Sequence, residues 1–141
     1  MPYSMGATLW SFNIYISAKN NPMELEFIFV NGHKISLLKS DTTIINDLQD
    51  AIDLLGNSSF NEAYKIIVFE KQLTPDFFDL KTKMAGDILQ KFSNYRMQLA
   101  IVGEFKKYKS KSLNDFIYES NQLRRVNFVS TIDEAKEVLG K

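Results

Sequence analysis

The residues best suited to bind a ligand are basic and lie in one stretch, GEFKKYKSKS, which follows a predicted buried strand. Four lysines fall in this stretch, and Ser110 and Ser112 stand where a helix is expected to begin. Lysine side chains beside the free N–H groups of a helix start can bind an anion. We therefore predict a ligand-binding loop containing Lys109, Ser110, Lys111 and Ser112. A solvated basic loop with capping serines is the simpler alternative.

Arg96 is a second candidate ligand residue. It follows a long amphipathic stretch, and its guanidinium can bind a carboxylate or phosphate through paired hydrogen bonds. A residue at such a position more often satisfies the last carbonyl groups of a helix. We expect Arg96 to lie beside the basic loop 106–112 and to contribute to the same anion site.

Composition excludes several kinds of catalytic site. The 141 residues include no cysteine and one histidine, which excludes thiolate metal sites, cysteine nucleophiles and sites built from several histidines. His33 adjoins a predicted turn and is interpreted as a turn-flanking residue. Asp47, Asp50 and Asp53 share one side of a predicted helix, where a solvated face is simpler than acid–base chemistry. With no glycine-rich phosphate loop, we predict no cofactor and no metal.

The charge balance bears on the partners of the chain. Lys and Arg number 17 and Asp and Glu number 17, so the formal net charge is zero. This balance lacks the basic footprint of a non-specific nucleic-acid binder. No apolar run reaches the roughly 20 residues that a membrane helix needs. We therefore predict a cytoplasmic protein without nucleic-acid or membrane partners, for which a protein partner or a homodimer is permitted.

The predicted strands come first in a hairpin and then singly. Asn31-Gly32 is the strongest short hairpin signal, because both central positions of such a turn need positive φ. Continuous apolar runs later in the chain predict strands buried on both faces, as in a parallel sheet. The expected strands are residues 25–30, 34–38, 64–69, 99–102 and Val126–Val129.

Helices are predicted between these strands. Residues 41–43 offer caps for a first helix that Gly56 should stop. Capping signals that begin at Ser112 and Thr131 predict the last two helices.

The stretch 74–96 joins two predicted buried strands and organises the chain. Thr74 can cap a short helical turn, and Pro75 fits the first position of that turn. After a break, a longer helix is expected over about Met84–Asn94, with its apolar side chains in one stripe, of which Ile88, Leu89 and Phe92 are predicted to be core. The stripe consists of Met84, Ala85, Ile88, Leu89, Phe92 and Tyr95.

The order of elements predicts an α/β fold: an N-terminal β-hairpin, then strand–helix units, in a mostly parallel sheet of four to five strands with helices on both faces. Residues 23–141 are expected to form this single domain and residues 1–22 an accessory segment that is dispensable for folding. Alternating apolar residues within 10–17 leave three interpretations of that segment. It is an added edge strand, an arm packed on a second copy, or an extension outside the core.

Four stretches carry a family resemblance: AGDILQKFSNYR, LAIVGEF, SKSLNDFIYESN and FVSTIDEA. They resemble a bacterial family known only as domain of unknown function 4180, over about residues 23–139. That family has no assigned activity, so the resemblance implies no mechanism. A looser likeness is to anti-sigma-factor antagonist (STAS) domains, in which a phosphorylatable Ser or Thr opens the helix after a central strand. By position, Thr82 is the nearest counterpart, although the acidic-Ser-Ser-Gly signature of those regulators is absent.

Two classes of function follow from these observations. The missing catalytic residue types and the fold likeness favour a non-enzymatic regulatory or interaction module of STAS-like type. The alternative is a small-molecule or anion-binding protein, including an enzyme that uses Lys or Glu. A deep pocket holding Glu104, Lys111 or Arg96 would favour the alternative, and a flat apolar patch would favour the interaction module.

Overall fold

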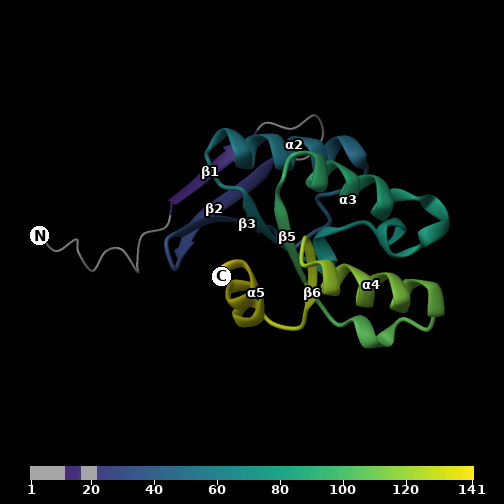
Figure 1. The fold of residues 1–141 in the computed structure, drawn as a ribbon. Helices are drawn as coiled ribbons and strands as arrows, with labels where there is room; N and C mark the ends of the chain where they lie inside the picture. The colour runs from purple at the N-terminus through teal and green to yellow at the C-terminus, as the bar shows by residue number, and fades with distance from the viewer. Residues whose placement is uncertain (1–11, 17–21) are drawn as a thin grey trace, which may run out of the picture.

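The computed structural model describes residues 12–16 and 22–141, which contain one sheet of six strands in the order β1-β2-β3-β4-β5-β6 (Figure 1). The pairs β1–β2 and β2–β3 are antiparallel, and β3, β4, β5 and β6 pair in parallel. The strands are β1 (Phe12–Ile16), β2 (Met23–Val30), β3 (His33–Lys39), β4 (Lys65–Phe69), β5 (Gln98–Val102) and β6 (Val126–Val129). The predicted α/β class and N-terminal hairpin are confirmed, with more strands than the expected four to five.

Three of the helices connect successive parallel strands and cover one face of the sheet (Figure 1). These are α2 (Leu48–Phe60), α3 (Met84–Asn94) and α4 (Lys111–Leu123). Right-handed crossovers place helices on the same face when the strand order advances in one direction, as it does here. The last helix, α5 (Ile132–Leu139), packs on the opposite face, so helices cover both faces as predicted.

The organising stretch folds as its sequence indicates. The Thr74 hydroxyl accepts a hydrogen bond from the Asp76 N–H, and a 3₁₀ turn follows at Pro75–Phe78. A second 3₁₀ turn, Leu80–Thr82, precedes α3, whose observed bounds are those predicted. Within the stripe, Ile88 and Phe92 are buried, whereas Tyr95 is 53% exposed. The stripe is therefore only partly core.

The start of α2 corrects the expected cap at residues 41–43. The cap is Asp47, because the chain just before it is drawn into strand-like pairing. Ile45 forms a parallel bridge with Leu73, and its N–H donates to the Gln72 carbonyl at 2.9 Å. These tertiary hydrogen bonds outweigh the local capping signal.

The expected stop at Gly56 is also wrong, since α2 continues to Phe60. A glycine inside a helix costs only about 1 kcal/mol relative to alanine, which packing can offset. Ser58 in the last turn is fully buried, and its hydroxyl bonds the Ser36 hydroxyl and the Ala63 carbonyl, each at 2.6 Å. Within the described ranges, no helix is both long and apolar enough to cross a membrane.

Candidate functional site

In open α/β sheets, ligands usually bind beyond the carboxyl ends of the strands. At that edge of this sheet, the chain after β4 meets the chain after β5 through one side chain, Glu70. Its carboxylate accepts hydrogen bonds from the Glu104 N–H at 3.1 Å and from the Tyr108 hydroxyl, and it pairs with the Lys107 ammonium at 2.9 Å. The side chain of Glu70 is only 14% exposed. Both carboxylate oxygens are therefore occupied by partners in the chain itself.

Gly103 permits this close approach. A Cβ atom at this position would lie 2.6 Å from both the Cβ and the Oε1 atoms of Glu70. Such a separation is shorter than van der Waals contact, so a larger residue would push the two loops apart. The Gly103 N–H also donates to the Val129 carbonyl at 3.0 Å, which fixes the loop to β6.

The electrostatics of this cluster favour fixed protonation states. Burial acts to raise the pKa of Glu70, but the hydrogen bonds from Tyr108, Lys107 and Glu104, with the Lys107 charge, outweigh it and lower the pKa below its ordinary value. Burial, the hydrogen bond to Glu70 and the Glu70 charge raise the pKa of Tyr108. A carboxylate that stays ionised and a phenol that stays neutral are poorly matched to proton transfer near neutral pH. The cluster therefore holds two loops together.

A second polar clamp lies next to it. The buried side chain of Gln72 donates to the carbonyls of Leu38 and Ser40, each at 3.0 Å, and accepts from the Phe69 N–H at 2.9 Å. A hollow of about 280 Å³ lies against the Glu70 cluster and is lined partly by Lys71 and Lys107. Both lysines are paired with acids, Lys71 with Asp41 at 3.6 Å and Lys107 with Glu70. The hollow therefore carries little uncompensated charge.

The topology adds a further restriction at this edge. Ligand crevices in doubly wound sheets form where the strand order reverses and adjacent loops diverge to opposite faces. Here the parallel strands follow in sequence order, and the crossover helices α2, α3 and α4 lie on one face. Among the described residues, no group of three or more His, Asp or Glu side chains is arranged to hold a metal ion.

The structure brings the predicted residues of the basic loop together at the start of α4. Ser110 is the cap, and its hydroxyl accepts from the Leu113 N–H at 3.2 Å, so the cap lies two residues before the one expected at Ser112. Ser112 is exposed in the first turn. Lys111 pairs with Asp115 at 2.8 Å, and this hydrogen bond and charge raise the pKa of Lys111.

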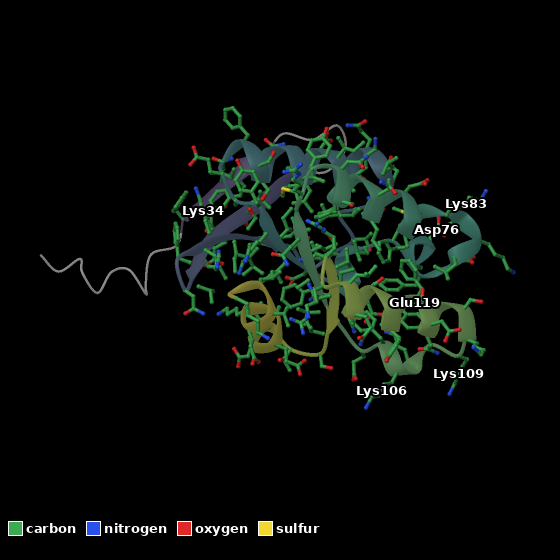
Figure 2. The ribbon with its side chains drawn as sticks, viewed as in Figure 1. Lys34, Asp76, Lys83, Lys106, Lys109 and Glu119 are labelled. Atoms are coloured by element: carbon green, nitrogen blue, oxygen red, sulfur yellow. The ribbon has the colours of Figure 1, made fainter. Side chains whose placement is uncertain are left out.

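Two lysines of this loop remain without an ion pair in the described ranges. Figure 2 shows Lys106 and Lys109 directed away from the body of the protein, into solvent. Lys107 and Lys111, in contrast, are neutralised by acids of this chain. The loop therefore offers about half of the positive charge that its sequence indicates.

Arg96 is not brought to this loop. It lies between α3 and β5, so it precedes the strand whose far end leads into residues 103–110. Its φ of 55° places it in the left-handed region, where it ends the helix connection. The length of β5 therefore separates Arg96 from Lys109.

Thr82 occupies the position just before α3, and its hydroxyl is already engaged. It donates to the carbonyls of Asp76 and Asp79 at 2.7 and 2.8 Å and accepts from the Met84 N–H at 3.2 Å. Phosphorylation of Thr82 would break these hydrogen bonds. The role of Thr82 as a phosphorylation switch stays a prediction.

Sequence reasoning missed a groove between α3 and α4 beside β6, with a volume of about 450 Å³. Leu89, Phe116 and Val126 supply apolar lining, and Leu123 on its rim is 80% exposed. Arg125 also lines the groove, and it has no ion pair within residues 12–16 and 22–141. The sequence signal was present in the apolar spacing of both helices, but that spacing predicted buried side chains and not that Leu89 and Phe116 line an open groove.

Comparison with known proteins identifies the family. No curated protein and no solved structure matches the chain significantly. Residues 30–139, which are most of the sequence, match the family described as Domain of unknown function (DUF4180), and the chain belongs to this family.

Proposed function

We propose that this protein is a non-enzymatic interaction module, of regulatory type, that binds an amphipathic helix of a protein partner in the groove between α3 and α4. The observation that carries the proposal is the contrast between this open, largely apolar groove and the closed Glu70 cluster at the carboxyl edge. The groove has the larger volume, about 450 Å³ against about 280 Å³.

The groove chemistry selects the kind of partner. Paired helices that lie side by side on a sheet offer a lengthwise channel, which suits a third helix with apolar residues at i, i+3, i+4 and i+7. Leu89, Phe116 and Leu123 would contact those side chains. Arg125 would pair with an acidic residue of the partner, because a guanidinium binds carboxylates with two hydrogen bonds.

Site-specific photo-crosslinking tests this proposal. A photoreactive residue is placed at Leu123 in cells of the source organism, and a matched one at Tyr118, which is 65% exposed on α4 but does not line the groove. A discrete adduct is expected from position 123 and not from 118. The crosslinked protein is then purified, and its affinity for the wild type is compared with that for Leu123→Asp and Tyr118→Asp.

We expect Leu123→Asp to weaken binding at least tenfold and Tyr118→Asp to leave it unchanged, since a buried charge is costly in an apolar interface. Equal adducts from both positions, or equal loss in both variants, would contradict the groove assignment.

Anion binding by the basic loop is the second candidate, favoured by the unpaired Lys106 and Lys109 beside the start of α4. Arg96 is too far along β5 to take part. Titration with inorganic phosphate, followed by NMR of the amides of Ser110 to Ser112, tests it. The paired substitution Lys109→Ala and Lys111→Ala should abolish any saturable shift and leave the unfolding midpoint nearly unchanged.

A further inference from the structure

The two edge strands of the sheet, β1 and β6, differ in whether their outward backbone N–H and C=O groups are hydrogen-bonded. At the β6 edge, the Asn121 amide donates to the Phe128 carbonyl at 3.3 Å, and its oxygen accepts from the Phe128 N–H at 2.7 Å. One side chain thus occupies the outward backbone groups in the middle of a four-residue strand. Natural proteins block sheet edges in this way to prevent unwanted pairing.

The β1 edge has no such block among the described residues. Within residues 12–16 and 22–141, no strand pairs with its outer side, and its sequence, FNIYI, contains neither proline nor a charged residue. Phe12 and Tyr15 are 43% and 75% exposed. A strand of this kind presents a row of free backbone donors and acceptors.

The register fixes which backbone groups of β1 are free. The two-residue turn Asn31-Gly32 closes on the pair Val30 and His33, which exchange both backbone hydrogen bonds in a hairpin of this length. Because the backbone N–H and C=O groups of successive residues alternate in direction along a strand, those of the odd-numbered residues of β2 point toward β1. Phe12 and Ile14, opposite two of these, therefore bond β2, and the N–H and C=O groups of Asn13 and Tyr15 point outward.

We infer that this edge pairs with a second copy of the chain, antiparallel, about a two-fold axis at Ile14. In that register Asn13 lies opposite Tyr15 of the second copy, and the reverse pair lies on the other side of the axis. These are the residues whose backbone groups point outward, so each pair would exchange both N–H···O=C hydrogen bonds. The contact is self-complementary, as a two-fold interface requires.

Charge and side chains support self-pairing over a random partner. No like charges meet in this register, because Asn13 and Tyr15 are uncharged, and the chain has a net charge of zero. The exposed Phe12 ring is tilted against the Phe27 ring, with their centroids 5.0 Å apart, and the Lys34 ammonium lies 5.3 Å from its centroid. Figure 2 shows Lys34 at the opposite end of the molecule from Lys109. A single pair of short strands buries little area, so the dimer is expected to be weak and to depend on concentration.

Sedimentation equilibrium of the full chain tests the inference with a double substitution, Asn13→Lys and Tyr15→Lys. Within one copy, the new lysines face Glu26 and Glu24 on β2, so the fold is kept. Across the axis, lysine faces lysine, which disfavours pairing. The dissociation constant of the dimer should rise at least tenfold, with an unchanged unfolding midpoint.

The matched control is Tyr15→Lys alone, which still faces Glu24 within one copy but meets the uncharged Asn13 of the second copy across the axis, and should retain the dimer. Amide exchange of the wild type gives a second readout that needs no variant. Exchange at Asn13 and Tyr15 should slow as protein concentration rises, whereas exchange at Phe128 should not change. A wild type that is monomeric at all concentrations, or a double-lysine variant that dimerises like the wild type, overturns the inference.

Discussion

The carboxyl edge of the sheet and the groove between α3 and α4 differ in how their polar groups are used. At the edge, the oxygens of Glu70 and the side-chain amide of Gln72 are bonded within the chain. In the groove, apolar side chains are left open, and Arg125 has no acidic partner among the described residues. Groups that are already satisfied stabilise a scaffold, whereas groups left unsatisfied at a surface can gain energy from a partner.

The largest expected effect concerns the two sides of α3. Phe92 lies in the core and is 1% exposed. Phe92→Ala should lower the free energy of unfolding of the protein by about 3–5 kcal/mol, because the substitution leaves a cavity. Leu89→Ala, on the half-buried groove side, should cost about 1 kcal/mol. Denaturant unfolding of both variants measures this difference, and equal losses would show that the groove lining is part of the core.

A smaller effect is expected at the closed edge from Gly103→Ala. The added methyl would meet the Glu70 side chain at 2.6 Å and should cost about 2 kcal/mol, within the usual range for overpacking. The hydrogen bond from Tyr108 to Glu70 should weaken, so the Tyr108 pKa, measured by absorbance titration, should fall toward its ordinary value. Gly86→Ala is the control, because nothing lies within 4 Å of the added Cβ atom there.

Glu70→Gln should cost about 1.5 kcal/mol at neutral pH, through the loss of hydrogen bonds to a charged group. The pKa of Glu70 is lowered in the folded protein, so its contribution is present above the ordinary value of about 4.5 and is lost as pH falls through the folded value. The stability difference between the wild type and the variant should therefore shrink in acid. Denaturant unfolding at a series of pH values measures this stability difference. A difference that is constant with pH would show that the ionised Glu70 carboxylate does not stabilise the fold.

The smallest effect is expected at the rim of the groove. Leu123→Asp should change the unfolding free energy by no more than about 0.5 kcal/mol, because the side chain is 80% exposed. Thermal unfolding checks this. A larger loss would mean that Leu123 supports the fold, and its use as a test of binding would fail.

Local signals in the sequence were sufficient for several elements. The Asn31-Gly32 turn, the cap at Thr74 with Pro75, and the helix Met84–Asn94 depend on residues close in the chain, and all are observed. The cap at Thr131 is likewise confirmed, since its hydroxyl accepts from the Glu134 N–H at 3.1 Å. The prediction that residues 1–22 are dispensable for folding stays a prediction: residues 12–16 form β1, and the rest, apart from Pro22, lies outside the described residues.

The sequence by itself determined the α/β class, the hairpin and the amphipathic helices, because periodicity and turn chemistry are local properties. Only the tertiary structure decided that Ile45 pairs with Leu73 and delays α2, that Glu70 reaches Tyr108 across 38 positions, and that Arg96 and Lys109 lie at opposite ends of β5. It also decided that Leu89 and Phe116 face one groove. These relations depend on strand order and helix placement, which bring together residues that no local pattern connects.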